Sequence, residues 1–334
     1  MLISRRSVLE LIGGSALVGG LQALPSAASA QQYPQKPVHI IVPFAPGGSL
    51  DGVPRAVAQE ISSRLGWTVI VDNRPGAGSQ TGTIAGKQAA PDGYTLTAIN
   101  GVSHGSASAL KADLGYDPIK DFTPIILTAD APLGLVVRSD LPVKSVAEFI
   151  DLLRKEPGKL NYGSGGFGTQ HHLASAMLFD QAGLRPDVAT HVPNKGLALA
   201  LNDLLAGSIQ FIIASVGPAW QHVASGKLRA LAVTGTKRME QFPEIPTMVE
   251  LGFRDFELLA WSGLAAPAGT PQAIINQWNQ AANQALKDGN VKKQLAGYDF
   301  QPRGGTPAEF ASFIERDIAR YRRLGQNAGL LQPN

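Results

Sequence analysis

One arrangement occurs twice in this sequence: an apolar strand segment runs into a glycine-rich loop, which opens a helix. The first copy spans 38–51, VHIIVPF followed by APGGSLD, and the second spans 159–169, KLNY followed by GSGGFGT. Such a loop presents backbone N–H groups at the positive end of a helix, where anions bind. Two such loops far apart in the sequence predict a ligand held between two lobes.

Residues 1–30 have the three parts of an export signal in order. Arg5 and Arg6 provide the basic start, 11–24 the apolar core, and 28–30 (ASA) the small-residue cleavage pattern. The run 4–9 resembles a twin-arginine signal, but Val8 and Glu10 depart from the usual pattern, so general secretion remains an alternative. The apolar core falls short of the ~20 residues that span a bilayer. We expect export to the periplasm with cleavage after Ala30.

Composition excludes several classes of site. The chain contains no cysteine, which excludes disulfides and thiolate metal sites. Its formal net charge is only +3, and the basic residues are scattered along the sequence. Nucleic-acid binding therefore has little electrostatic support.

Strand and helix signals alternate along the chain, which predicts an α/β fold with largely parallel sheets. We expect strands at 38–44, 68–72, 94–99, 124–128, 133–138, 159–162, 188–192, 209–214, 228–234 and 261–266. Helices are expected at 53–65, from the turn 74–78 through Ala90, and at 146–155, 171–182, 196–205, 271–287, 291–296 and 307–328. The strand 133–138 is a candidate for carrying the chain into a second lobe, and 228–234 for returning it.

Two short motifs indicate enzyme classes, both weakly. Residues 163–168 fit the dinucleotide pattern G-x-G-x-x-G, but the acidic residue expected downstream, Asp187, lies in a proline-containing loop. Residues 101–105 fit the G-x-S-x-G pattern of esterases, with Ser103 as nucleophile and Asp203 and His222 as possible partners. The segment 106–110 is too short to form the helix that an esterase elbow requires, so a secreted serine hydrolase using Ser103 stays an alternative.

Histidines and one aspartate near the loops have simpler interpretations. The adjacent His171 and His172 point to different helix faces and have no carboxylate at ligand spacing, so no metal site is expected. His39 lies in a buried-type strand and is expected to be a core residue. Asp51 is expected to accept N–H groups at the helix start and so to fix the first loop.

Seven segments together resemble one family. They are 42–49 (VPFAPGGS), 72–78 (DNRPGAG), 90–94 (APDGY), 116–124 (YDPIKDFTP), 158–163 (GKLNYG), 226–233 (GKLRALAV) and 266–271 (APAGTP). The chain resembles the Bug receptors, the extracytoplasmic solute-binding proteins of tripartite tricarboxylate transporters. The resemblance implies an α/β, two-lobed type II periplasmic binding protein in which each lobe is a mixed, mostly parallel sheet flanked by helices. The expected lobes are 31–130 plus 235–334, which form a discontinuous first lobe, and 131–234.

The same resemblance implies a ligand site made mostly of backbone amides. The residues that match it in the first lobe are Phe44, Pro46, Gly47, Gly48, Ser49, Asp51, Ser103 and His104. Those in the second lobe are Ser164, Gly165, Phe167, Gly168, Thr169, His172, Asn194, Ala214 and Ser215. The implied ligand is a small organic carboxylate bound without a cofactor, and the implied partners are membrane transporter subunits that receive it from a monomeric receptor. A receptor that signals to a sensor protein is a further alternative.

Departures from the family pattern bear on the ligand. Leu50 replaces a threonine, Phe167 an asparagine, and Asn194 a tyrosine. The family's frequent Phe-Asp-Asn is here 213–215 (IAS), which removes a carboxylate that could pair with a ligand ammonium group. An unpaired buried charge costs several kcal/mol. We therefore expect amino acids to bind poorly.

Overall fold

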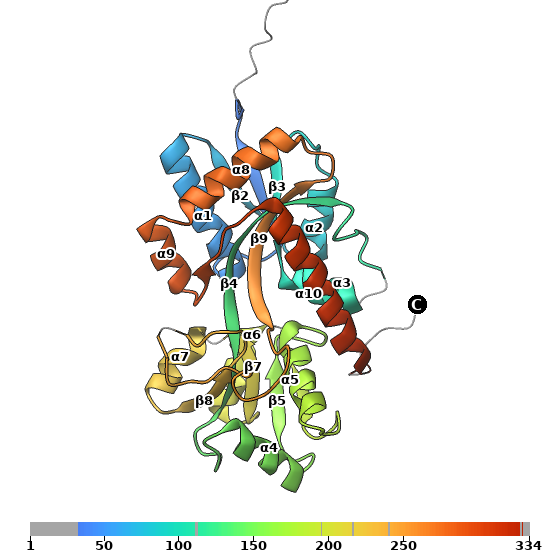
Figure 1. The fold of residues 1–334 in the computed structure, drawn as a ribbon, viewed down its shortest axis with the longest axis vertical. Helices are drawn as coiled ribbons and strands as arrows, with labels where there is room; N and C mark the ends of the chain where they lie inside the picture. The colour runs from blue at the N-terminus through green and yellow to red at the C-terminus, as the bar shows by residue number, and fades with distance from the viewer. Residues whose placement is uncertain are drawn as a thin grey trace, which may run out of the picture. The chain divides into compact units, whose positions relative to one another are not determined.

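The fold is organised around one long strand, β4 (Phe122–Arg138), which runs through both halves of the sheet (Figure 1). The computed structural model describes residues 33–110, 113–194, 196–215, 217–239, 241–327 and 329, so the expected signal segment and its cleavage site lie outside it. Residues from Lys36 onward form one unit, and the description below concerns that unit.

The strands of the described residues run in the order β2-β1-β3-β9-β4-β7-β5-β6, with β8 and β10 also paired to β4. Their bounds are β1 Val38–Val42, β2 Val69–Asn73, β3 Thr95–Asn100, β5 Asn161–Ser164, β6 Thr190–Pro193, β7 Phe211–Ser215, β8 Leu228–Val233, β9 Leu259–Pro267 and β10 Gln301–Pro302. Every antiparallel pair involves β4 or β9, whereas β1, β2 and β3, and likewise β5, β6 and β7, pair in parallel. The predicted α/β class with mixed sheets in two lobes is confirmed.

Helices flank both halves of the sheet. Their bounds are α1 Ser49–Leu65, α2 Gln80–Lys87, α3 Ala107–Leu110, α4 Val146–Lys155, α5 Gln170–Gln181, α6 Leu197–Ala206, α7 Gly217–Ala224, α8 Gln272–Ala285, α9 Gly289–Ala296 and α10 Pro307–Asn327, with a short 3₁₀ segment η1 (Ala77–Ser79) and a π-helical segment η2 (Gly101–Ser106). Figure 1 shows α1, α8 and α9 around one half of the sheet and α4 to α7 around the other. Helix α10 packs on η2 and β4 and reaches α5.

The prediction of separate strands at 124–128 and 133–138 is wrong, because β4 is continuous. It pairs with β9 as far as Pro132 and with β7 and β8 from Leu133 onward. Proline cannot donate to a β ladder, but here it stands where the strand changes partners. The side-chain oxygen of Thr234 accepts the N–H of Leu133 at 2.8 Å and donates to the carbonyl of Leu258. Thr234 thus joins three chain segments at the change of partner.

Apolar side chains from both faces fill the cores of the two halves. Trp261 and Phe310 anchor one cluster under α10, and Leu204 and Trp220 belong to another between α6 and α7. His39 is exposed on β1, so its prediction as a core residue is wrong. In the described part of the chain, no helix combines the length and apolar character needed to cross a membrane.

Candidate functional site

The first glycine-rich loop connects β1 to α1 and is exposed at Pro46, Gly47 and Gly48. Gly48 is the N-cap of α1, and Gly47 adopts a left-handed φ of 97°, which glycine tolerates without strain. Ser49 is half-buried in the first turn of the helix. The loop therefore presents backbone rather than side chain at the start of α1.

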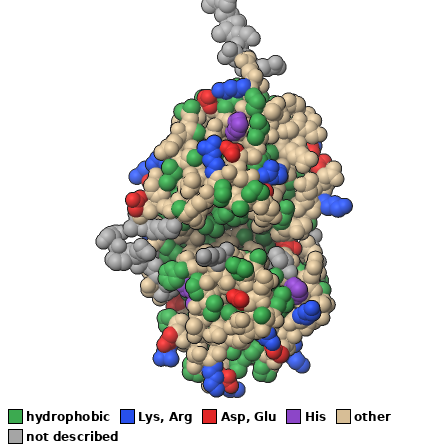
Figure 2. All heavy atoms as spheres, turned by 180° about the vertical axis from the view of Figure 1, so that it is seen from behind, with side chains coloured by type: hydrophobic (Ala, Val, Ile, Leu, Met, Phe, Trp, Pro, Cys, Tyr) green, Lys and Arg blue, Asp and Glu red, His purple; other side chains and the backbone are tan. Residues whose placement is uncertain are grey.

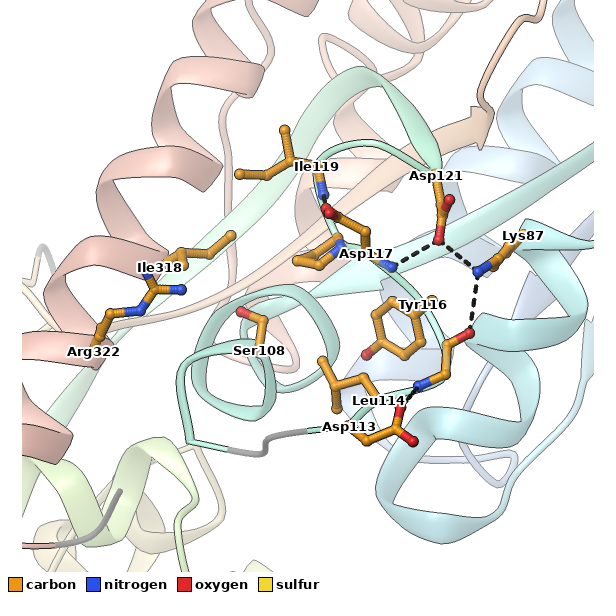
Figure 3. Close-up of a pocket in the computed structure, with 12 residues that line it drawn as sticks. Lys87, Ser108, Asp113, Leu114, Tyr116, Asp117, Ile119, Asp121, Ile318 and Arg322 are labelled. Carbon is orange, nitrogen blue, oxygen red and sulfur yellow. Dashed lines mark hydrogen bonds and ion pairs between the residues drawn. The ribbon is translucent and has the colours of Figure 1, made fainter. Parts of the chain in front are cut away.

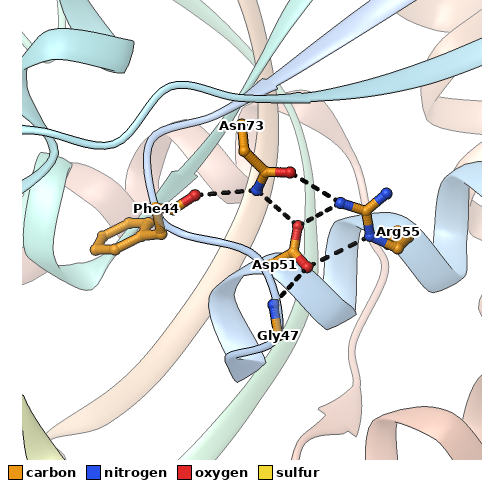
Figure 4. Close-up of polar contacts among 5 residues, drawn as sticks. All are labelled: Phe44, Gly47, Asp51, Arg55 and Asn73. Atoms are coloured by element: carbon orange, nitrogen blue, oxygen red, sulfur yellow. Dashed lines mark hydrogen bonds and ion pairs between the residues drawn. The ribbon is translucent and has the colours of Figure 1, made fainter.

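Asp51 fixes this loop from beneath (Figure 4). Its carboxylate is only 4% exposed and accepts the N–H of Gly47 at 3.0 Å, the side-chain amide of Asn73 at 2.8 Å and the guanidinium of Arg55 at 2.7 Å. Asn73 also donates to the carbonyl of Phe44 at 2.9 Å, whereas the half-buried Phe44 ring points away from the network in Figure 4. Partial burial acts to raise the pKa of Asp51, but hydrogen bonds from Arg55, Asn73 and Gly47 outweigh it and leave the pKa below its usual value.

This network decides which amides remain for a ligand. The N–H of Gly47 is committed to Asp51. Among the described residues, no acceptor lies within hydrogen-bond distance of the N–H groups of Gly48 and Ser49. Since the positive end of α1 favours an anion, these two groups are suited to a carboxylate.

The second glycine-rich loop connects β5 to α5 and is held largely by its own hydrogen bonds. Ser164 is fully buried; its hydroxyl accepts the N–H of Gly166 and lies 2.7 Å from Nε2 of His191. Thr169, the N-cap of α5, donates both its N–H and its hydroxyl to the carbonyl of Gly166. Gly165 is half-buried in the same loop. The loop is thus shaped before any ligand arrives.

His172 supports the tip of this loop from below. Its Nδ1 accepts the N–H of Gly168 at 3.1 Å, and its ring stacks on His191 with centroids 3.9 Å apart. Burial, with a smaller contribution from His191, lowers the pKa of His172 to about 4, so the ring is neutral and able to accept. Phe167 is 65% exposed, and its ring centroid is 4.9 Å from that of His172.

A pocket of about 560 Å³ opens beside this aromatic group and is lined by Tyr162, Phe167, Phe179, His172 and His191, with Asp180, Asp187 and Asn327 at polar positions. Of the predicted site residues, Phe167 and His172 line this pocket. Seen from behind the view of Figure 1, the surface is hollowed across its middle, and hydrophobic side chains gather along this hollow (Figure 2).

Ser103 and His104 lie in η2 and are both fully buried. The Ser103 hydroxyl is 3.0 Å from Nδ1 of His104 and also bonds the backbone of Asn100, whose side chain caps the segment in return. Burial lowers the pKa of His104 to about 3, and its Nε2 has no hydrogen-bond partner. These two side chains therefore brace the segment from inside and do not reach its surface.

Three further predicted residues lie at the ends of β6 and β7. The N–H of Asn194 donates to the carbonyl of Ser164 at 3.2 Å, which links Asn194 to the second loop. Ala214 is buried within β7, where it pairs with Gly134 of β4, and Ser215 ends the strand half-buried.

The structure thus places the predicted residues of the first loop at the start of α1 and those of the second loop at the start of α5. Segment η2, which contains Ser103 and His104, and helix α3 lie beside the second loop. A Cβ on Gly168 would lie 3.1 Å from Leu110, and one on Gly101 would lie 3.0 Å from Oε1 of Gln170. His171, which was not predicted as a site residue, lies against Gly165 with both ring nitrogens buried and without a hydrogen-bond partner. Burial lowers its pKa to about 4. In the sequence, only the position of His171 directly after the second glycine-rich loop could have indicated that it lies against Gly165.

A second pocket, of about 550 Å³, contains no residue of either glycine-rich loop in its lining (Figure 3). Asp117, Asp121 and Lys87 line one side, where Lys87 bonds Asp121 at 2.8 Å, and Ile318 and Arg322 of α10 line the other. None of the predicted site residues lines it. Within the described ranges, no cluster of histidine, aspartate and glutamate is arranged to hold a metal ion.

Comparison with known proteins points to one family. Residues 53–330 match the model of a family described as the tripartite tricarboxylate transporter family receptor. The periplasmic binding protein BugD is similar in structure, with 31% identity and a TM-score of 0.76 over 90% of this chain and 100% of its own. An R. palustris protein solved with adipate has 32% identity and a TM-score of 0.78, covering 89% of this chain and 98% of its own. MatC from Rhodopseudomonas palustris, solved with bound malate, has 31% identity and a TM-score of 0.75, covering 87% and 99%.

Proposed function

Because the chain belongs to the tripartite tricarboxylate transporter receptor family, we propose that it captures a small organic carboxylate in the periplasm and delivers it to membrane transporter subunits. The ligand would lie between the two glycine-rich loops, one from each half of the sheet. Similar proteins solved with adipate and malate support this ligand class. We propose that the lobes are 31–130 plus 235–334 and 131–234, and that the receptor acts as a monomer.

The unpartnered N–H groups of Gly48 and Ser49 at the start of α1 carry this proposal. They are held in place by Asp51, which binds the preceding amide and neutralises Arg55. A carboxylate bound there would replace water with two aligned donors at a positive helix end. In this site, backbone N–H groups would stabilise the negative charge of the ligand.

Hydrolysis is not part of the proposed function. A serine nucleophile needs an accessible hydroxyl and a histidine oriented by a third group. The Ser103 hydroxyl is buried, and Nε2 of His104 has no partner. We infer that the pair is structural and that the protein makes and breaks no covalent bond in its ligand.

A thermal-shift screen of residues 31–334 tests the proposal. The panel contains adipate, malate, citrate, benzoate and several amino acids. A ligand at one hundred times its dissociation constant should add ~2.7 kcal/mol to the free energy of unfolding, a shift of a few degrees for a chain of this size. A shift with a non-amino carboxylate supports capture. Ester hydrolysis that disappears in Ser103→Ala, with no shift by any carboxylate, would contradict it.

A further inference from the structure

The loop between α9 and β10 contacts helices from both halves of the sheet. Tyr298 packs on α1, where a Cβ on Gly52 would lie 2.3 Å from its ring. The next residue, Asp299, packs on the start of α7, where a Cβ on Gly217 would lie 2.1 Å from its Oδ2. Gly52 follows Asp51 of the first loop, and Gly217 follows closely on Ser215 at the end of β7. The loop therefore bridges the two sides of the proposed ligand site.

Both the backbone conformation of Asp299 and the burial of its carboxylate are energetically unfavourable in this contact. Its φ of 59° is left-handed, a region that aspartate and asparagine enter at some cost. Its Oδ2 is buried and has no hydrogen-bond partner, although an ionised carboxylate needs several donors. Burial alone raises the pKa of Asp299 to about 6.

In the described part of the chain, no charged side chain pairs with this carboxyl, and its Oδ2 accepts no hydrogen bond from the start of α7. On α1, Asp51 and Arg55 pair with each other. The first turn of α7 contains no acidic residue, and its histidine, His222, lies in the last turn. The ring of Tyr298 is directed at Gly52.

We propose that Asp299 couples ligand capture to proton uptake, because the lobe arrangement in which Gly217 covers its carboxyl is favoured when that carboxyl is protonated. This inference rests on the proposed function, in which the lobes close around the ligand. When the lobes separate, Gly217 withdraws and the carboxyl is solvated. A rise in pH from 3.8, the ordinary pKa of this carboxyl, to about 6 therefore favours separation, and a fall through the same range favours the covered arrangement.

A ligand-free experiment tests the lobe arrangement directly. Since the chain has no cysteine, Ser63→Cys on α1 and Lys155→Cys on α4 give two exposed labelling sites, one in each half. Energy transfer between dyes on this pair should rise as the pH falls from 7.5 to 5. In Asp299→Asn, which keeps the shape and tolerates left-handed φ, transfer should be high at both pH values. Transfer in this variant that matches the unsubstituted chain at both pH values would overturn the proposal.

Calorimetry with adipate and malate as probes tests the coupling to capture. Asp299→Asn should bind about tenfold more tightly than wild type at pH 7.5, and the difference should narrow at pH 5 and disappear below about pH 4, where the carboxyl is protonated in both lobe arrangements. Partial exposure keeps the effect below the larger limit that the raised pKa of Asp299 sets. The protonation state of the ligand affects both proteins equally at a given pH, so it does not alter the ratio of their affinities. Equal affinities at pH 7.5 would contradict the coupling.

Asp255→Asn is the matched control, because Asp255 also has a left-handed φ, of 52°, but is exposed and lies 3.8 Å from Arg323. It should behave as wild type, and an Asp299-like response in this variant would overturn the proposal. If wild type binds neither probe, the proposed ligand class is at fault. The dye-labelled, ligand-free chain still tests Asp299 in that case.

Discussion

Gly48 stands at the start of α1, where the fold itself does not require a glycine. Its φ of −82° suits any residue, and no atom lies within 4 Å of the position that a Cβ would occupy. The fold therefore does not require glycine here. The absence of a side chain leaves the N–H groups of Gly48 and Ser49 accessible.

Gly48→Leu should weaken carboxylate binding by at least about tenfold, since its side chain would occupy the space over two donors worth ~1–3 kcal/mol together. The melting temperature should stay within about one degree of wild type, because surface changes of this kind alter stability little. Calorimetry and thermal unfolding measure the two effects. Gly289→Leu is the control, since Gly289 is also exposed with open space at its Cβ position. Unchanged affinity in Gly48→Leu would remove the first loop from the site.

Asp317 gives the protein a pH-dependent stability of its own. It is 2% exposed, accepts the indole N–H of Trp261 at 2.8 Å, and has its pKa raised to about 6, mainly by burial. The folded state then binds its proton more tightly than the unfolded state, whose value is 3.8. The stability that this group contributes is complete below about pH 4 and is lost as the pH rises through 6.

Asp317→Asn should remove this dependence and raise the free energy of unfolding at pH 7, by up to about 3 kcal/mol. The asparagine oxygen can still accept from Trp261. Urea unfolding of both proteins at pH 4.5 and pH 8 measures the effect. A variant less stable than wild type at pH 8, with the same pH slope, would show that the carboxylate is stabilised by Arg320, which lies 3.7 Å away.

At the scale of elements, the sequence indicated local features such as helix caps correctly. It did not show that one strand, β4, changes its pairing partners along its length. Ser145 caps α4 by accepting the Glu148 N–H at 3.2 Å, and this Ser-x-x-Glu spacing is visible in the sequence. Asp51 fixes the first loop as predicted. The break expected near Pro132 did not occur, because a proline's missing donor matters only where a partner strand needs it. Helix α7 was not predicted; it is short, and it begins at Gly217 and Pro218.

Thr234 is the residue on which the junction of β4 with its partners depends. Thr234→Val keeps the shape but leaves the N–H of Leu133 and the carbonyl of Leu258 without this partner. We expect a loss of about 1–3 kcal/mol in the free energy of unfolding. Urea unfolding measures it, with the exposed Thr68→Val as a control that should change little. Equal effects of the two substitutions would show that the junction does not depend on the hydroxyl.

At the scale of the whole molecule, the two glycine-rich loops indicated a bilobal receptor before the topology was known. The sequence could not show that Ser103 and His104 turn inward, because a buried and an exposed G-x-S-x-G segment have the same pattern. Nor could it bring Asp299 to Gly217, since a contact between residues so distant in the chain depends on how the two halves of the sheet are placed. Resemblance to a family supplied candidate site residues, whereas only the three-dimensional structure shows which backbone amides make no hydrogen bond within the protein.

The proposed site between the two halves makes a prediction about ligand selection that matched pairs of ligands can test. Aspartate carries an ammonium group where malate carries a hydroxyl group. Likewise, 2-aminoadipate carries an ammonium group where adipate carries a hydrogen atom. Because β7 ends in Ser215 and offers no carboxylate there, each amino acid should bind at least about tenfold more weakly than its partner. Competition calorimetry measures the ratio. Preference for the amino acids would contradict this expectation and would point to Asp299 as the pairing carboxylate.

The continuity of β4 has a mechanical consequence. Because β4 is hydrogen-bonded to neighbouring strands in both halves of the sheet, a change in its twist in one half alters the orientation of the other half. Substitutions that alter its twist near Pro132 and Leu133 would therefore change the resting angle between the halves without touching a ligand. In such a molecule, evolution can tune how tightly the cargo is held separately from which cargo is chosen.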